Sequence, residues 1–371
     1  MSYKDTSPKY WAEYSNLQRV KHELIRNYIN GWFPKVASSA NTLVYVDTHA
    51  GRGRHLQGQL GSPLVALQAI AGHKAAPRLL ARTRVEMRFI ERDEDNFAAL
   101  NEELSVARYD GDRIRVRGKC DDCFRVIETI SDWLEKGPDG KQRWVPAFVF
   151  VDPYGFKVPA SVLRRLLSFN GTELFVNFMW REMDMAIRQG KQSALAPTLD
   201  SVFGTPKWRT IADVEDYETR CQMGIQALHQ GYAARWSTSF RMLAENGHTR
   251  YILMHLSNHD AGRDLMKTVM WKSCPQGGFY ARKADSQQQE VLIQPRPNLE
   301  PLRHWVLRQL ATPTRWTDLS QALLHTMWLE RHLTQTIKTL ARDGLIEDVD
   351  QQGIPVKKYN PMLALTAASK S

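Results

Sequence analysis

Short apolar segments that alternate with helical patterns dominate the first half of the chain. Three runs, TLVYVD at 42–47, PAFVFVD at 146–152 and TELFVNFM at 172–179, have the length and composition of buried strands. VEMRFIE at 85–91 is similar, and 113–117 is a weaker candidate. Amphipathic helical patterns separate them, at residues 63–71, 96–105, 124–136 and 160–167. Strands that alternate with helices predict βαβ units, and hence an α/β fold with a mostly parallel, doubly wound sheet.

The regions on either side of this alternation are predicted to be mainly helical. Residues 9–33 carry apolar side chains at helical spacing, and Pro34 together with the small-residue run 37–40 is expected to end that helix. The stretch 180–239 has mostly helical patterns, and one more strand is expected at 250–257.

The last part of the chain has a different pattern. Residues 285–301, rich in Gln and Pro, break the alternation, and we place a linker at 291–300. Three helical segments follow, and then two strands are expected around Gln352-Gly353. This pattern predicts a winged helix-turn-helix domain over 301–371, with a small helical dimerisation cap as the alternative. The first domain is then expected to span 1–290, with a helical insertion at about 181–245.

The net charge of +10 is the property of the composition that bears most on function. A basic surface attracts polyanions, so nucleic acid, DNA or RNA, is the leading class of partner. Apolar residues at 43% and charged residues at 24% are typical of globular proteins and exclude a disordered chain. Neither a membrane-spanning apolar run nor a signal-peptide core is present, so we expect a cytoplasmic protein with no membrane partner.

The cysteines do not suggest a metal site. Cys120 and Cys123 form a single C-x-x-C pair, while Cys221 and Cys274 stand apart. A structural zinc site needs four ligands, and no second close pair is present. We therefore expect reduced thiols and no metal.

The first predicted strand is followed by the string DTHAGRGR at 47–54. Two glycines after a strand, Gly51 and Gly53, let the backbone turn tightly and approach a ligand closely. The string differs from the G-x-G-x-x-G dinucleotide fingerprint. Its early acid, Asp47, suits a turn that holds a nucleoside bearing an amino acid.

Acidic residues also follow the next three predicted strands. Glu91 could accept hydrogen bonds from both ribose hydroxyls of a nucleoside. Asp121 and Asp122 could receive an adenine amino group or cap the following helix. Each of these acids, like Asp152 after the fourth strand, could alone be a loop residue. Because ligands bind beyond the carboxyl ends of such strands, four in succession favour a site for S-adenosylmethionine (SAM), with the reaction centre at the fourth.

The strings VYVDTHAGRGR, GSPLVAL, FIERDE and VDPYGF, in this order, resemble a bacterial family that methylates an adenine exocyclic amine in large-subunit ribosomal RNA. A Lys-His pair on the N-terminal helix belongs to the same pattern. The length, the D-P-Y-G-F variant and the C-terminal extension look closer to the three-Cys-motif partner proteins (TcmP). These are a methyltransferase-like family encoded beside a separate protein that bears three cysteines. The resemblance covers roughly residues 17–180 by motif.

This resemblance implies a Rossmann-like, SAM-dependent methyltransferase fold that modifies a base amino group. The residues expected around SAM are His22, Asp47, His49, Ala50, Gly51, Gly53, Ser62, Glu91, Asp121 and Asp122. The expected catalytic residues are Asp152, Pro153 and Tyr154. Two of the cofactor residues have simpler interpretations in the sequence: His22 as a surface histidine, and Ser62 as a helix N-cap followed by Pro63.

The motif after the fourth strand departs from the amine-methylating pattern. Those families carry D-P-P-Y, whereas Asp152-Pro153-Tyr154 is followed here by Gly155-Phe156. The acid and an aromatic ring remain, so a flipped base could still be held by its edge and face. The missing proline leaves a non-methylating use of the fold open.

A basic segment with interleaved aromatic residues lies at 261–283. Cations for phosphates and aromatic rings for bases are what single-strand binding requires. The candidate nucleic-acid contacts are Arg263, Lys267, Trp271, Lys272, Arg282 and Lys283. The alternative is a basic helix over 260–271 whose apolar face packs on the sheet.

Two functions remain open from the sequence. The first is a SAM-dependent methyltransferase that acts on nucleic acid. The second is a non-catalytic or differently catalytic subunit that binds nucleic acid and a three-Cys-motif, radical SAM-like partner. A nuclease or helicase has no support, because we find no Walker loop and no nuclease core of paired acids with a lysine.

Overall fold

The computed structural model describes residues 11–136, 144–282, 297–351, 353–354 and 359–367. The chain divides into two compact units. The first comprises residues 1–269 with 280–289, and the second comprises residues 270–279 with 290–371.

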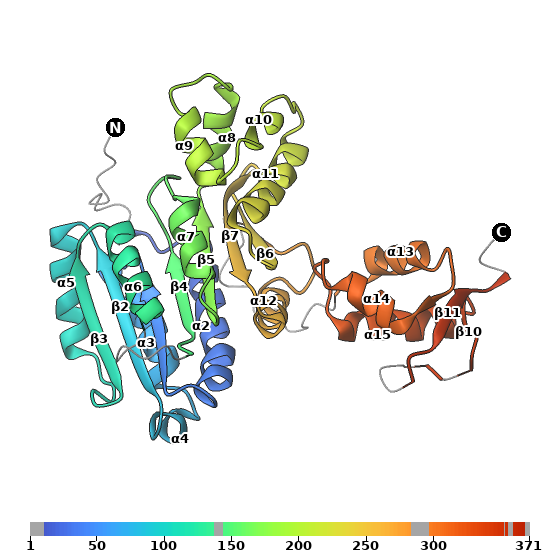
Figure 1. Cartoon of the computed structure of the whole chain (residues 1–371), viewed down its shortest axis with the longest axis horizontal. Coiled ribbons are helices and arrows are strands. Elements are labelled where there is room, and N and C mark those ends of the chain that lie inside the picture. Colours follow the sequence, from blue (N-terminus) through green and yellow to red (C-terminus); the bar gives the residue numbers. More distant parts are fainter. Residues whose placement is uncertain (1–10, 137–143, 283–296, 352, 355–358, 368–371) are drawn as a thin grey trace. The chain divides into compact units, whose positions relative to one another are not determined.

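The described residues of the first unit form an α/β fold around an eight-stranded sheet with the order β3-β2-β1-β4-β5-β7-β6-β8 (Figure 1). The five parallel strands are β1 (Thr42–Asp47), β2 (Arg84–Glu91), β3 (Ile114–Cys120), β4 (Ala147–Val151) and β5 (Thr172–Phe178). β7 (Thr249–Ser257) runs antiparallel to β5 and to β6 (Trp236–Leu243), and β8 (Tyr280–Arg282) pairs with β6. The predicted α/β class with a mostly parallel sheet is therefore confirmed.

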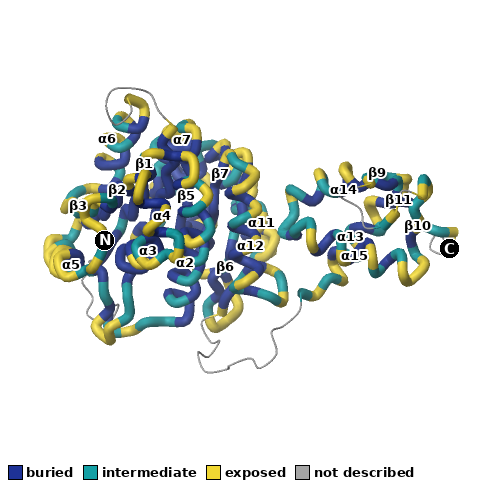
Figure 2. The backbone as a smooth tube through the Cα atoms, turned by 90° about the horizontal axis from the view of Figure 1, so that it is seen from below, coloured by how far each residue is buried: buried dark blue, intermediate teal, exposed yellow. Residues whose placement is uncertain are grey.

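Helices connect these strands and cover the sheet, so its central strands lie in the interior (Figure 2). Every residue of β4 and β5 is buried, as expected for parallel strands covered on both faces. The connecting helices are α2 (Asn16–Ala37), α3 (Ser62–Ala71), α4 (Ala76–Leu80), α5 (Glu94–Val106), α6 (Cys123–Lys136) and α7 (Ala160–Leu167). After β5 come α8 (Trp180–Arg188), α9 (Ala196–Phe203), α10 (Trp208–Ile211), α11 (Tyr217–Tyr232) and α12 (Asp260–Ser273). The second unit begins within α12, at Met270.

The first helix ends within the predicted small-residue run 37–40, and not at Pro34. α2 continues through Pro34 to Ala37. Proline has no N–H to donate to the carbonyl four residues earlier, so the Asn30 carbonyl loses its usual helical partner. His73 Nε2 lies 3.2 Å from that carbonyl oxygen and replaces the lost hydrogen bond. A partner 43 residues away thus permits a proline that local sequence rules treat as a helix end.

The helical prediction for 180–239 is correct as far as α11 but misses the start of β6. Trp236, Thr238, Phe240 and Met242 are buried in alternation with half-buried residues. This period of two is the signature of a strand with one covered face. Here it begins only four residues after α11 ends.

The second unit contains helices α13 (Glu300–Gln309), α14 (Trp316–Leu323) and α15 (Glu330–Arg342). Its described strands are β9 (Thr314–Arg315), β10 (Ile346–Asp348) and β11 (Met362–Leu365), which form an antiparallel sheet in the order β10-β11-β9. Gln352, where the turn of the wing was predicted, lies outside the described residues. In the described parts of both units, every helix is too short or too polar to cross a membrane.

Candidate functional site

The strand order reverses direction between β1 and β4. From β1 the chain builds the sheet outward through β2 and β3, and from β4 it continues through β5 on the other side. In open α/β sheets, ligands bind beyond the carboxyl ends of the strands at such a reversal. Asp47 is the last residue of β1, and Asp152 directly follows β4. The structure therefore brings these two acids, predicted from separate motifs, to the same edge.

The loop after β1 makes the tight glycine turn that the sequence indicated. Gly51 and Gly53 have φ angles of +62° and +80°, which side chains other than glycine rarely adopt. A Cβ atom on Gly51 would also lie 2.4 Å from the ring of Trp11. The Ala50 N–H donates to the Ile90 carbonyl at 2.8 Å, which ties this loop to the end of β2.

Glu91, at the end of β2, organises the two loops around it. Its Oε2 accepts from the Gly51 N–H at 2.8 Å. Its Oε1 accepts from the N–H groups of Arg92, at 2.8 Å, and Asp93, at 2.9 Å. A carboxylate has about four acceptor positions, so about one remains for a ligand hydroxyl. The strand-end position of Glu91 predicted a ligand for this carboxylate but not its hydrogen bonds to the backbone.

Asp47 is fully buried, and the structure leaves part of its carboxylate without a partner. The His49 N–H donates to Oδ1 at 3.2 Å, whereas Oδ2 accepts no hydrogen bond within the described residues. The pKa of Asp47 is raised to about 7, mainly by burial and in smaller part by the charge of Asp152. A hydrogen bond with the Ser62 side chain acts in the opposite direction.

Ser62 does not cap α3 as the sequence suggested. The N-cap is Gly61, and Ser62 and Pro63 occupy the first turn of the helix. The interaction of Ser62 with Asp47 places its side chain at the strand ends. The structure therefore removes capping as the reason for this serine.

Asp152 is held by side chains from two distant elements. Lys21 on α2 forms an ion pair with Oδ2, and both side chains are largely buried. The Asn177 Nδ2 at the end of β5 donates to Oδ1 at 2.6 Å. The Oδ1 of Asn177 is itself buried without a hydrogen-bond partner in the described residues. In the sequence, Lys21 stands out only as part of the Lys-His pair, and the only signal for Asn177 is its place near the end of a predicted strand.

The residues after Asp152 form a tight turn. Pro153 is buried, Gly155 has a φ of +82°, and Tyr154 between them is 48% exposed. An exposed aromatic ring beside a half-buried acid has the geometry to stack on a planar base.

His22 is buried rather than on the surface. Its Nδ1 lies 2.9 Å from the Tyr14 hydroxyl, and the ring of His55 lies 6.4 Å away. Trp11 and Tyr14 both contact His55, so the four rings form one cluster. Burial holds the pKa of His22 well below its usual value. His22 therefore contributes a neutral ring on α2, one position from Lys21.

His49 and Cys123 also meet near the strand ends. The His49 Nδ1 lies 2.8 Å from Thr48 Oγ1, and its Nε2 lies 3.5 Å from Cys123 Sγ. Burial lowers the pKa of His49 to about 4 and raises the pKa of Cys123 to about 12, so both are neutral at pH 7. In the described part of the chain, no three His, Cys, Asp or Glu side chains are arranged to hold a metal ion.

Asp121 and Asp122 both have structural partners. Asp121 pairs with Lys119 at 2.9 Å and with Arg125, whose hydrogen bonds hold its pKa well below the usual range. Asp122 accepts from the N–H groups of Phe124 and Arg125 at the start of α6, at 3.0 and 3.2 Å. It therefore caps this helix, the alternative that the sequence left open.

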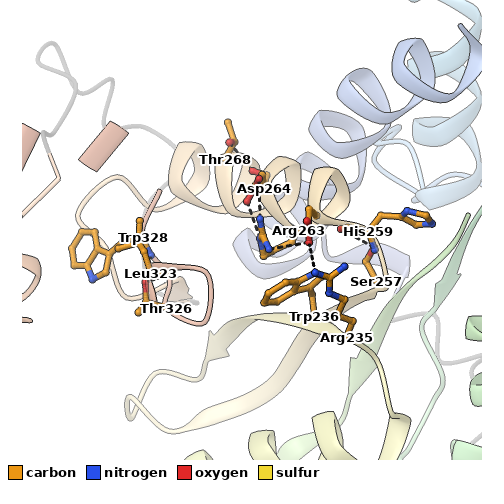
Figure 3. Close-up of polar contacts among 11 residues, drawn as sticks. Arg235, Trp236, Ser257, His259, Arg263, Asp264, Thr268, Leu323, Thr326 and Trp328 are labelled. Atoms are coloured by element: carbon orange, nitrogen blue, oxygen red, sulfur yellow. Dashed lines mark hydrogen bonds and ion pairs between the residues drawn. The ribbon is translucent and has the colours of Figure 1, made fainter. Parts of the chain in front are cut away.

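The structure does not support the six predicted nucleic-acid contacts as a group. Arg263 is 3% exposed. Its guanidinium donates hydrogen bonds to Asp264 and lies 4.2 Å from the ring centroid of Trp236 (Figure 3). Lys267 is also 3% exposed, and burial lowers its pKa to about 8. Phosphate contacts need accessible cations, so the expectation for these two residues is corrected.

The other members of this group differ in exposure. Trp271 is buried in the second unit, with ring centroids 5.0 Å from Trp328 and 4.5 Å from His332. It is a core residue and not a platform for bases. Lys272 and Arg282 are exposed, and Lys283 lies outside the described residues.

A pocket of about 950 Å³ lies in the first unit. It is lined by residues of α8, α11 and the β6–β7 hairpin, among them Arg188, Tyr217 and His248. None of the predicted site residues lines it.

Comparison with known proteins adds little. No protein-family model matches this sequence, and no curated protein does. Among solved structures, a Legionella pneumophila protein is 12% identical, with a TM-score of 0.37, over 66% of this chain and 85% of its own. A SAM-dependent methyltransferase from Agrobacterium tumefaciens is 11% identical, with a TM-score of 0.32, over 66% of this chain and 62% of its own. The plantazolicin methyltransferase BamL is 11% identical, with a TM-score of 0.32, over 65% of this chain and 86% of its own. At such scores, these likenesses do not indicate what this chain binds or does.

Proposed function

We propose that this chain is a SAM-dependent methyltransferase that acts on the amino group of a nucleic-acid base. One observation carries the proposal. Asp47, Glu91 and Asp152, together with the glycine turn at Gly51, gather at the strand ends that flank the reversal of strand order. The motif order that resembles the adenine-methylating and TcmP families supports the same assignment.

The residues at this edge fit a nucleoside cofactor that bears hydroxyl and amino groups. Asp47 Oδ2 and Asn177 Oδ1 are buried acceptors without partners among the described residues, and Glu91 keeps an acceptor position. Buried polar atoms are normally satisfied, so such acceptors suit a ligand that supplies donors. When bound, SAM supplies an activated methyl group. Asp47, Glu91 and the Gly51 turn would hold it, with His22, His49 and Ser62 nearby.

Asp152 would orient the target amine. As a carboxylate it accepts an amino hydrogen and directs the nitrogen lone pair away from the acid. Lys21 and Asn177 fix the direction of both carboxylate oxygens. Tyr154 is exposed and would stack on the base while Asp152 reads its edge. The positive φ of Gly155 turns the chain directly after Tyr154, in a motif that lacks the second proline of D-P-P-Y.

The proposal extends to the second unit, which we assign as a winged-helix domain. Its support is the order of three helices and three short strands that form a small antiparallel sheet. The outer face of α15 carries Arg331, Gln335, Lys338 and Arg342, all exposed and spaced at helical intervals. Such a face suits contact with nucleic acid.

The alternative is a non-catalytic subunit that binds nucleic acid and a three-Cys-motif partner. The ion pair of Lys21 with Asp152 favours it, because it occupies the oxygen that a target amine would need.

Calorimetry with SAM and with S-adenosylhomocysteine tests whether the chain binds the cofactor, which the proposal requires. We expect both to bind the wild-type chain, and Asp112→Asn, which changes an exposed acid before the amino end of β3, opposite the carboxyl strand ends, to bind them equally well. Transfer of labelled methyl groups to mixed RNA and to DNA then separates the two functions. Binding of SAM without transfer to either would favour the non-catalytic subunit, and no binding at millimolar cofactor would refute both uses of this site.

A further inference from the structure

The outer two strands of the sheet present a row of basic side chains on one face. The parallel register places Glu86 beside Arg115, Arg88 beside Arg117 and Ile90 beside Lys119. Alternate residues of a strand share a face, and so do paired residues of parallel strands. The cations of this face, which we call the β2–β3 basic face, are Arg84, Arg88, Arg115, Arg117 and Lys119.

These cations outnumber the acids that accompany them. Glu86 contacts Arg88 at 3.1 Å and Arg115 at 3.7 Å, and Asp121 contacts Lys119 at 2.9 Å. Arg84 and Arg117 have no ion pair among the described residues. The face therefore carries five cations against two acids, an excess of three positive charges.

The excess charge affects the face itself. Burial is the main cause of the lowered pKa of Arg88, and the charges of Arg117 and Arg115 lower it further. Glu86 opposes this effect but does not cancel it. Like charges on neighbouring strands destabilise a sheet, so this arrangement costs the folded chain free energy.

Protection of the sheet edge does not account for the whole face. β3 is an edge strand, and charged side chains on edge strands prevent pairing with other chains. That accounts for Arg115, Arg117 and Lys119. Arg84 and Arg88 lie on β2, which is already paired on both sides. Edge protection therefore does not explain the two arginines of β2.

We propose that the β2–β3 basic face binds the phosphate backbone of a nucleic acid. Arginine presents a planar fork of donors that matches phosphate oxygens, and four of the five cations are arginines. Alternate residues along a strand are about 6.8 Å apart, so each row can follow a chain of phosphates. The cores of protein–protein interfaces are apolar and aromatic, whereas the exposed positions of this face are all charged.

Such a face positions a nucleic acid without reading its sequence. Base recognition needs groups that reach base edges or stack on them, and the face has neither amide nor aromatic side chains. β4, which Asp152 follows, lies two strand spacings from β2 and three from β3, about 10 and 14 Å, so the face lies beside the proposed cofactor residues rather than at Asp152. The inference rests on the proposed function only for the identity of the polyanion.

Fluorescence anisotropy without cofactor tests the inference on the full chain. The probes are a 20-nucleotide single strand and the corresponding duplex, each as RNA and as DNA, over a series of salt concentrations. The test variant is Arg84→Gln/Arg115→Gln/Arg117→Gln, which leaves Asp121 and its Lys119 partner intact. The matched control, Arg164→Gln/Arg188→Gln/Arg308→Gln, removes three exposed arginines elsewhere and changes the net charge equally.

We expect the test variant to bind at least tenfold more weakly at low salt and the control to lose much less. The slope of log affinity against log salt should fall by roughly two to three units in the test variant, since each lost phosphate contact contributes about 0.7–0.9. Thermal unfolding should show both variants folded. Equal losses in the two variants would overturn the inference.

Two further outcomes distinguish a nucleic-acid ligand from an acidic protein, and this inference from the proposed function. Poly-glutamate that binds through the same three arginines while all four nucleic acids fail would overturn the inference in favour of an acidic protein partner. Nucleic-acid binding that depends on the face, combined with no methyl transfer, would support it and count against the proposed function alone.

Discussion

Glu91 and Asp152 are both acids at the strand ends, but the structure holds them in different ways. Glu91 accepts three backbone N–H groups from the two loops beside it. Asp152 is held by two side chains, Lys21 from α2 and Asn177 from β5. Backbone donors cannot leave unless a turn refolds, whereas side chains can rotate to new partners. In the proposed function, the cofactor side of the site would thus be a fixed frame, whereas the target side would exchange its contacts when a base enters.

The largest expected effect comes from the target side. Asp152→Asn should lower methyl transfer by about a hundred- to ten-thousand-fold, because the group that orients or deprotonates the amine is lost. Cofactor affinity should stay within a few-fold, because the backbone frame around Glu91 is untouched. Single-turnover assays and calorimetry measure the two quantities. A comparable loss in both would show that the two sides are not separate.

The second largest effect concerns Asp47, whose raised pKa should make the free energy of unfolding depend on pH. Its pKa is about 7 when folded and 3.8 ordinarily, so between these values the folded chain holds a proton that the unfolded chain releases. The free energy of unfolding should therefore fall as pH rises from about 4 to about 7, by on the order of 4 kcal/mol at about 1.4 kcal/mol per pKa unit.

Asp47→Asn should remove this dependence. Relative to the wild type, the variant should gain stability between pH 4.5 and pH 8, as measured by urea unfolding. The histidines with lowered pKa values are present in both proteins, so their contributions cancel. Asp112→Asn, at an exposed acid, is the control. A constant difference between variant and wild type over this range would contradict the prediction.

A smaller effect is expected from the frame itself. Glu91→Gln replaces one acceptor oxygen with a donor that faces backbone N–H groups, so the frame loosens. Loss of a hydrogen bond to a charged group costs about 1.5–3 kcal/mol, which corresponds to roughly a ten- to hundredfold loss of SAM affinity. Glu94→Gln, an exposed neighbour in the first turn of α5, should bind SAM normally in the same calorimetric titration. Unchanged affinity in Glu91→Gln would remove this residue from the cofactor site.

The smallest effect concerns the exposed ring on the target side. Tyr154→Ala should weaken substrate binding by about 1–3 kcal/mol through lost stacking, whereas Tyr154→Phe should retain most of the affinity. The measurement is the dissociation constant of each variant for the nucleic acid that serves as methyl acceptor, before methylation. If both substitutions were equally harmful, the hydroxyl rather than the ring would be the contact.

Local pattern was sufficient for the strands and helices that carry the site. β1 spans the predicted residues 42–47 and α7 the predicted 160–167, while β2, β4 and β5 differ by one residue at one or both ends. Apolar runs and helical periodicity are properties of short segments, so they are visible in sequence. The meeting of Asp47 and Asp152 also follows from sequence, because the carboxyl ends of parallel strands share one edge.

The sequence by itself thus determined the α/β class, the edge where the acids gather and the glycine turn at Gly51. Only the tertiary structure decided which partner each acid has. Lys21 meets Asp152 across 131 residues, and His73 completes a helix around Pro34. Arg263 and Lys267 belong to a basic segment in sequence, yet packing buries them, while the β2–β3 basic face forms only when two strands pair. The physical reason is that periodicity reports on neighbours along the chain, whereas burial and ion pairing depend on contacts between segments that only folding brings together.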